Sequence, residues 1–123
     1  MKPATQRDSG IRALVIIGDT VAVTFLDADD QLDSMRKTIG CRTITGAGYP
    51  NEKHAAWVDD EGLIGNEPIV SLTEVRWYPE PLAGAILITG FDPDTGDTTP
   101  AMMTVEEAQQ LVIKRSFLLR DYD

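Results

Sequence analysis

The segment Leu82-Ala83-Gly84-Ala85-Ile86-Leu87-Ile88-Thr89-Gly90 decides how this chain folds. Within it, residues Ala85–Thr89 are almost all apolar and stand at consecutive positions, without alternating polar side chains. A short apolar run of this kind is typical of a strand that is covered on both faces. We therefore predict that Ala85–Thr89 is the central strand of a sheet.

Two β-rich runs precede it near the N-terminus. Arg12–Ile17 is mostly apolar, and after Gly18-Asp19 an alternating pattern resumes at Val21 and continues to Leu26. Glycine at the first central position suits the tight turns whose twist matches that of the flanking strands. The two runs are predicted to form a hairpin.

A short amphipathic helix is predicted next. Its N-terminus can be capped by Asp29 or Asp30, and Gly40 is suited to end it. The apolar residues that fall at helical spacing between these ends are Leu32, Met35 and Ile39.

The middle of the chain is predicted to contain short elements. His54–Val58 is interpreted as a strand that ends in the turn Asp59–Gly62. Asn66–Leu72 is interpreted as a short helical turn, because Pro68 suits the start of a helix. Val75–Trp77 alternates like an edge strand that the following prolines terminate.

The C-terminal helix has the clearest local signal. Thr104–Glu107 has the spacing of a capping box, in which the threonine hydroxyl and the glutamate satisfy each other's backbone amides. An apolar stripe follows at Ala108, Leu111 and Val112, and Phe117–Leu119 continues it if the helix runs on.

These elements lack the steady alternation of strand and helix that builds a parallel sheet. We therefore predict an α+β fold: one small domain with a mixed, mainly antiparallel sheet, an N-terminal hairpin and two or three covering helices. Residues 1–10 are predicted to be a flexible tail and residues 11–123 the domain.

Composition restricts the function. The 123 residues include 20 acids and 11 bases, for a net charge of -9, which disfavours direct binding to nucleic acid. The single cysteine, Cys41, cannot form an internal disulfide and is expected to be a buried thiol in a reducing compartment. With no apolar run long enough to span a membrane, we expect a soluble, cytoplasmic protein that does not bind membranes.

Catalytic and cofactor motifs are not evident. One cysteine and one histidine cannot make a zinc site, and His54 is interpreted as a surface or strand-edge histidine without a nucleophile elbow. No complete phosphate-binding loop is present. Asp92–Asp97 resembles a calcium loop, but its glycine is misplaced, so we interpret it as a hairpin loop. We expect no cofactor, no metal and no enzymatic activity.

The segments Ala55–Asn66 and Leu82–Gly90 resemble the small acidic proteins of phages, plasmids and actinobacterial genomes that share domain of unknown function 3846. The resemblance covers roughly Ile11–Val112 and departs from the family at Ile69 and Val70, where small residues are usual. It implies an accessory protein of a mobile element, without catalysis of its own.

Two surfaces are candidates for binding a partner. The first is the acidic turn Asp59, Asp60 and Glu61, which also has the composition of a structural turn. The second is Trp77-Tyr78 beside two prolines, because tryptophan and tyrosine are enriched where interfaces bind most strongly. Trp77 can equally belong to the core.

Two classes of function are left open. The first is a protein-binding module that inhibits a basic host factor, either one that handles nucleic acid or a defence factor, through its acidic surface. The second is a ligand-binding or metal-dependent enzyme that uses carboxylates near Asp59 or Asp94.

Overall fold

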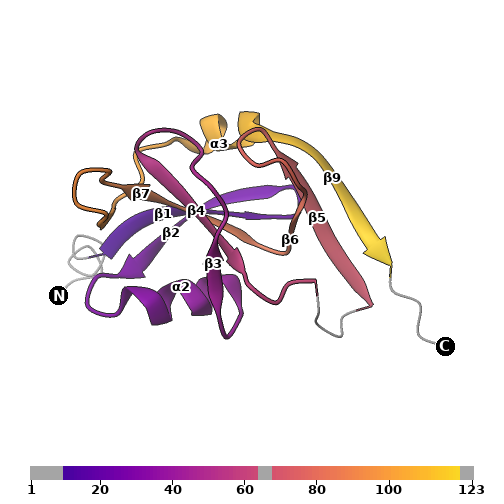
Figure 1. The fold of residues 1–123 in the computed structure, drawn as a ribbon, viewed down its shortest axis with the longest axis horizontal. Helices are drawn as coiled ribbons and strands as arrows, with labels where there is room; N and C mark the ends of the chain where they lie inside the picture. The colour runs from indigo at the N-terminus through magenta and orange to yellow at the C-terminus, as the bar shows by residue number, and fades with distance from the viewer. Residues whose placement is uncertain (1–9, 64–67, 120–123) are drawn as a thin grey trace.

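The computed structural model describes residues 10–63 and 68–119, and these contain nine strands and two helices (Figure 1). The elements are β1 (Gly10–Ile17), β2 (Thr20–Asp27), α2 (Gln31–Ile39), β3 (Ile44–Gly46), β4 (His54–Asp59), β5 (Ile69–Val75), β6 (Leu82–Ala83), β7 (Ile86–Phe91), β8 (Thr98–Thr99), α3 (Val105–Leu111) and β9 (Val112–Leu119).

The larger sheet has six strands in the order β2-β1-β7-β4-β3, and β8 pairs with the end of β7. All its pairings are antiparallel. Strand β7 lies in the middle, where Ile88 pairs with Leu14 of β1 on one side and with Ala56 of β4 on the other. Its residues Ile86–Ile88 are fully buried, so the predicted central strand is confirmed.

The predicted N-terminal hairpin is also confirmed. Strands β1 and β2 pair from Gly10 with Asp27 to Ile17 with Thr20, which leaves Gly18 and Asp19 as the two-residue turn. Gly18 has φ 59°, the positive value that such a turn requires at its first central position. Gly10 already belongs to β1, and the rest of the predicted tail lies outside the described residues.

A second, three-stranded antiparallel sheet has the order β6-β5-β9. The helical turn predicted for Asn66–Leu72 is wrong where it is described, because Ile69–Leu72 belongs to β5; Asn66 lies outside the described residues. The strand predicted for Val75–Trp77 is wrong too, since β5 ends at Val75 and Trp77 lies in the turn that follows. The β-branched residues Ile69 and Val70 favour the strand.

Helix α3 begins with the predicted capping box. Thr104 Oγ1 accepts from the Glu107 amide at 3.0 Å, and Glu107 Oε1 accepts from the Thr104 amide at 2.8 Å. The helix ends at Leu111 and does not continue through Phe117–Leu119, which forms part of β9. Pairing with β5 supplies backbone hydrogen bonds to this segment, and that long-range gain decides in favour of the strand.

Helix α2 ends as predicted at Gly40, whose φ of 84° is left-handed. Its N-terminus differs from the prediction, because the Asp30 side chain makes no capping bond. The preceding turn is held instead by the Asp27 carboxylate, which accepts from the Asp29 amide at 2.9 Å. Met35 is buried, but Leu32 is 50% exposed and does not join the core.

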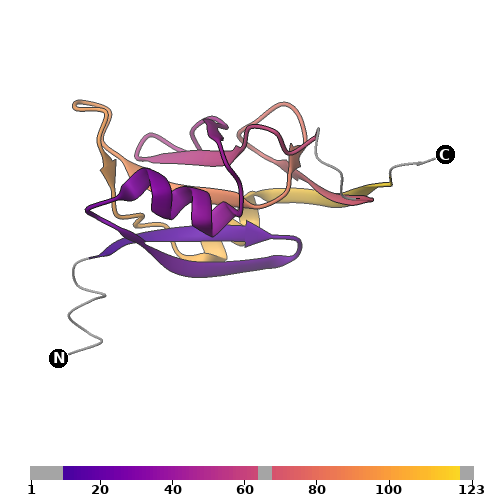
Figure 2. The same ribbon diagram turned by 90° about the horizontal axis from the view of Figure 1, so that it is seen from below.

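The two helices lie on opposite sides of the larger sheet (Figures 1 and 2). On the α2 side, Met35 packs with Leu26 and Leu87. On the other side, a larger core joins residues of the first sheet to α3 and to the second sheet; its members include Leu14, Ile16, Ile86, Ile88, Val75, Leu82 and Ala108.

The molecule is thus a small α+β domain built from two antiparallel sheets, where we predicted one mixed, mainly antiparallel sheet. Neither of the described helices has the length and apolarity to cross a membrane.

Candidate functional site

The acidic turn Asp59, Asp60 and Glu61 lies at the end of strand β4. Two of its three carboxylates make hydrogen bonds within the domain. The Asp59 carboxylate accepts from the Glu61 amide at 2.8 Å. Both carboxylate oxygens of Glu61 accept hydrogen bonds from the Arg42 guanidinium, at 2.9 and 3.1 Å. Hydrogen bonding to Glu61 raises the pKa of Arg42. Asp60 is exposed, and its carboxylate has no described partner. The predicted turn is confirmed, whereas a role in binding a partner stays a prediction.

Trp77 and Tyr78 are half-buried rather than displayed on the surface. The indole of Trp77 donates to the Ala47 carbonyl at 2.8 Å, and both rings pack against the core. The rings also lie on Gly48: a methyl group there would come within 3.1 Å of Trp77 and 3.2 Å of Tyr78. This arrangement favours a structural role for the two rings over a freely accessible platform.

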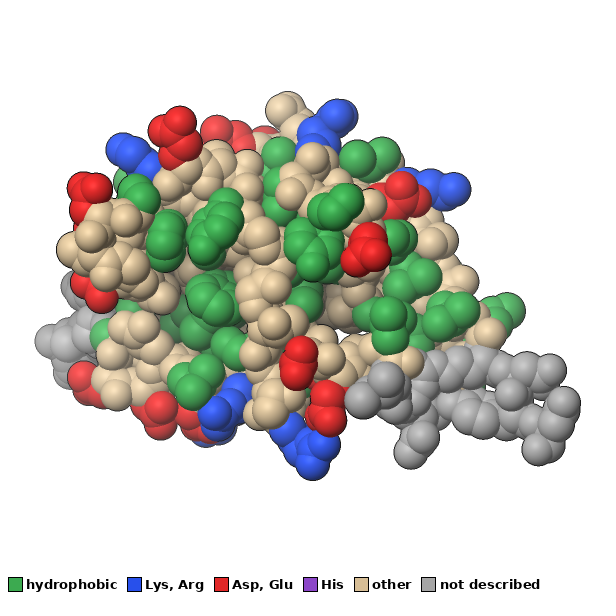
Figure 3. All heavy atoms as spheres, in the orientation of Figure 1, with side chains coloured by type: hydrophobic (Ala, Val, Ile, Leu, Met, Phe, Trp, Pro, Cys, Tyr) green, Lys and Arg blue, Asp and Glu red, His purple; other side chains and the backbone are tan. Residues whose placement is uncertain are grey.

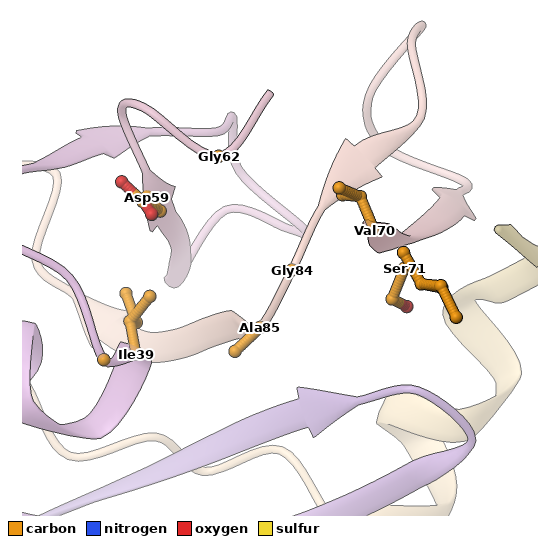
Figure 4. Close-up of a pocket in the computed structure, with 9 residues that line it drawn as sticks. Ile39, Asp59, Gly62, Val70, Ser71, Gly84 and Ala85 are labelled. Carbon is orange, nitrogen blue, oxygen red and sulfur yellow. The ribbon is translucent and has the colours of Figure 1, made fainter. Parts of the chain in front are cut away.

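The two sequence-predicted surfaces do not converge on one point. Asp59 pairs with Ile44 at one end of the β3–β4 ladder, whereas Trp77 contacts Ala47 beyond its other end. A cavity of about 190 Å³ does open beside Asp59, between the end of α2, the start of β5 and the connection to β7 (Figure 4). This volume is below the ~300 Å³ that ligand pockets typically have.

His54 is buried, 5% exposed, and not the surface histidine that we predicted. Its Nε2 accepts from the backbone amides of Met102 and Met103 at 3.1 and 3.2 Å, and its Nδ1 lies 2.8 Å from Asn51 Oδ1. Nε2 therefore carries no proton, and Nδ1–H donates to Asn51. Burial lowers the pKa of His54, and the charge of Arg12 lowers it further against the opposing effect of Glu107.

Arg12 holds the same segment from the other side. Its guanidinium donates to the carbonyls of Ala101 and Met103, each at 2.8 Å, while the Ala101 amide donates to the Arg12 carbonyl at 2.7 Å. Arg12 and the Nε2 of His54 thus hold residues 101–103 from two sides, while the Nδ1 of His54 bonds Asn51. These contacts give both residues a structural role in positioning this segment.

A pair of aromatic rings, one exposed and one half-buried, lies elsewhere, where sequence reasoning did not place a site. Tyr49, in the loop after β3, is 60% exposed, and its ring centroid is 5.2 Å from that of Phe91, the last residue of β7. The Phe91 amide donates to the Lys53 carbonyl at 2.8 Å, which brings the two segments together. Together with Asn51, Glu52 and Pro93, the rings line a surface groove of about 420 Å³.

The loop Asp92–Asp97 continues from this groove. The Asp92 amide donates to the Asp97 carbonyl at 3.0 Å, and the Asp92 carboxylate accepts from the Asp94 amide at 2.9 Å. The predicted hairpin loop is therefore confirmed. Asp94 and Asp97 are exposed, in a loop that follows Phe91 directly. We call the surface formed by Tyr49, Glu52, Phe91, Pro93, Asp94 and Asp97 the acidic aromatic face.

Comparison with known proteins identifies the family. The model of domain of unknown function 3846 matches residues 11–112, which is most of the chain. The chain belongs to the DUF3846 family. No curated protein and no solved structure matches this DUF3846 chain. The family match ends at Val112, where β9 begins, so almost all of that strand lies beyond the part that the family shares.

Two observations on this DUF3846 domain bear on metal and nucleophilic chemistry. Within residues 10–63 and 68–119, no three His, Cys, Asp or Glu side chains are grouped as a metal site. Cys41 is half-buried, and burial, with a further contribution from Asp59, raises the pKa of its thiol. A raised pKa leaves little thiolate at neutral pH, which is the nucleophilic form.

Sequence reasoning missed Tyr49, which lies in the segment Gly46–Asn51. There a large aromatic residue stands among two glycines and a proline. That composition is the one sequence signal for an exposed ring. Its pairing with Phe91 depends on the β4–β7 register and is not visible in the sequence.

Proposed function

We propose that this DUF3846 domain acts by binding another protein, and that its acidic aromatic face takes a basic segment of that partner. The observation that carries the proposal is the exposed ring of Tyr49, which packs on the half-buried Phe91 beside the loop Asp92–Asp97. The resemblance to proteins of mobile elements makes a basic, nucleic-acid-handling host factor the partner that we favour.

Charge and aromatic surface supply different parts of binding. A net charge of -9 attracts a basic partner and raises the rate of encounter, an effect that salt weakens. Tyrosine and phenylalanine supply rigid apolar area that holds a complex once it has formed. Arginine side chains also stack on aromatic faces, so a basic segment suits both halves of this surface.

The acidic turn at Asp59 is the competing surface for the same kind of partner. Glu61 is already paired with Arg42, and Asp59 with the Glu61 amide, which leaves Asp60 as its exposed carboxylate. The acidic aromatic face has Glu52, Asp94 and Asp97 exposed without a described ion pair. We therefore expect it to contribute more to association.

The test begins with capture from host lysate at low and high salt, followed by purification of the captured protein and measurement of its binding rates. Tyr49→Ser should speed dissociation, whereas Leu32→Ser, which alters an equally exposed apolar residue on α2, should not. Lys53→Ala removes the cation next to Glu52 and should speed association.

The charge variants separate the two acidic surfaces. Glu52→Gln with Asp94→Asn and Asp97→Asn should slow association more than Asp59→Asn with Asp60→Asn and Glu61→Gln. The proposal fails if Tyr49→Ser and the first charge variant both bind the purified partner like the parent. A thermal shift of several degrees with a metal ion or nucleotide, and no captured protein, would favour a ligand-binding function near Asp59 or Asp94 instead.

A further inference from the structure

Strand β9 is an open edge of the second sheet. In the order β6-β5-β9, strand β9 pairs with β5 on one side. On its other side, no strand among the described residues pairs with it. Figure 1 shows β5 and β9 extending to the right of the larger sheet. An edge of eight residues is a template for pairing with another strand unless it is protected.

Large apolar side chains gather on this edge and on the adjoining end of β5. Figure 3 shows hydrophobic side chains over this end of the molecule. The exposed ones are Ile69 (57%), Ile113 (56%), Phe117 (66%), Leu118 (40%) and Leu119 (72%). Because side chains alternate along a strand, Leu118 lies on the opposite face of the sheet from Phe117 and Leu119, so apolar surface is exposed on both faces of this edge. Burying such a surface is a driving force for association.

The direction of the free backbone groups follows from the neighbouring pairing. The Ser71 carbonyl accepts from the Gly84 amide, so Ser71 points its backbone groups towards β6 and away from β9. Its partner Phe117 is then a non-hydrogen-bonded position of the β5–β9 pair. Because these directions alternate along a strand, Arg115 and Phe117 present their N–H and C=O groups to the open edge.

We propose that a second copy of this chain binds at this edge, with the two β9 strands antiparallel across a two-fold axis at Ser116. A two-fold axis normal to a continuous sheet brings side chains of the same face opposite each other. Because side chains alternate between the faces, the sequence numbers of two opposed residues then add up to an even number. An axis at Arg115 would oppose two arginines, which is unfavourable. An axis at Ser116 places Arg115 opposite Phe117 of the second copy and Ile113 opposite Leu119.

This register accommodates the charges of the edge. Lysine and arginine on an edge strand usually discourage pairing, and β9 contains Lys114 and Arg115. In this register, Lys114 faces Leu118 of the second copy and Arg115 faces its Phe117. The guanidinium of an arginine is attracted to the face of an aromatic ring. The bases also bring positive charge against an otherwise acidic copy, which favours a second copy over a basic partner at this surface.

The groups that border the free edge of β9 are those that a second copy would cover. A stable interface buries ~800 Å² on each side. The backbone of β9, the parts of its apolar side chains next to the edge and the aliphatic stems of Lys114 and Arg115 would contribute to it. The inference does not depend on the proposed function, because β9 and the loop Asp92–Asp97 lie at opposite ends of the molecule (Figures 1 and 2).

Single cysteines test the register directly. In a Cys41→Ser background, Ser116→Cys places two thiols in a non-hydrogen-bonded pair about 4.5 Å apart between Cα atoms, within reach of a disulfide. Lys114→Cys is the matched control two residues away on the same face, where the two copies are ~14 Å apart. Under mild oxidation with diamide, we expect a covalent dimer from Ser116→Cys to form at least about tenfold faster than from Lys114→Cys.

Sedimentation of the full chain tests the dimer itself. We expect twice the chain mass at micromolar concentrations, and the monomer mass for Phe117→Lys. Phe117→Pro is a second variant, because it removes an amide that faces the open edge and no bond to β5. Circular dichroism should show both variants folded. The proposal is overturned by a parent chain that stays monomeric, by a dimer that survives both substitutions, or by equal cross-linking at positions 114 and 116.

Discussion

His54 is predicted to make the stability of the domain depend on pH above the range in which carboxylates titrate. The side chain is buried, and its unprotonated Nε2 accepts from two backbone amides in the segment Met102–Met103. A proton on Nε2 would remove both hydrogen bonds and place a charge in the interior. Burial accordingly lowers the pKa of His54 in the folded state.

The sign follows from comparing the two states. Below pH ~6.5 the unfolded chain takes up a proton at His54, while the folded chain does not until the pH reaches its lower pKa. Stability is therefore full above pH ~6.5 and falls as the pH decreases towards the folded pKa, by up to ~1.4 kcal/mol per pH unit. Glu107 acts in a separate window: hydrogen bonds with Thr104 lower its pKa, so its contribution is lost only below pH ~4.3.

Urea unfolding between pH 7.5 and 5.0, followed by the fluorescence of Trp57 and Trp77, measures this slope. His54→Gln keeps an acceptor for the amides but cannot take up a proton, so its stability should change little across this range. His54→Ala should be less stable than the parent by roughly 3 kcal/mol at pH 7.5, because two amides lose their acceptor. The reasoning is refuted if His54→Gln retains the slope of the parent.

Three further outcomes are expected. Thr104→Ala should lower the free energy of unfolding by about 1 kcal/mol through loss of the helix cap, measured by urea unfolding against Thr45→Ala as an exposed control. Gly90→Ala should destabilise by ~3 kcal/mol or more, because the added methyl would lie 2.7 Å from the Thr99 carbonyl oxygen and closer still to Pro100 O and Thr99 Oγ1; an unchanged thermal midpoint would contradict this. Calorimetry with calcium and magnesium should detect no tight binding at Asp59–Glu61 or Asp92–Asp97, and a dissociation constant below the micromolar range would contradict it.

The elements that could be predicted from sequence are those whose signals are local. A two-residue Gly-Asp turn fixes the register of the hairpin, and a capping box fixes the start of α3. Consecutive apolar residues in β7 identify the strand that is covered on both faces. Each of these signals is contained within about ten residues.

Strands β5 and β9 could not be predicted because the gain that selects them is non-local. Phe117–Leu119 fits a helical stripe as well as a strand when it is considered alone. Pairing of Ile69 with Leu119 across fifty residues decides for the strand. The same applies to the candidate site, because Tyr49 and Phe91 are brought together by strand register. Trp77 is of a residue type that often anchors an interface. In the structure, however, its indole donates to the Ala47 carbonyl and so belongs to the fold.

The position of β7 between β1 and β4 has a consequence for how the chain acquires its structure. During synthesis, the hairpin Gly10–Asp27 can form early, but its free side stays exposed until Ile86–Phe91 has been made. Pairings over such separations close slowly, in milliseconds to seconds for β-rich domains. Until then, the edges of β1 and β4 that β7 covers are open to wrong partners, so slower insertion of β7 lengthens the time in which the chain can misassemble.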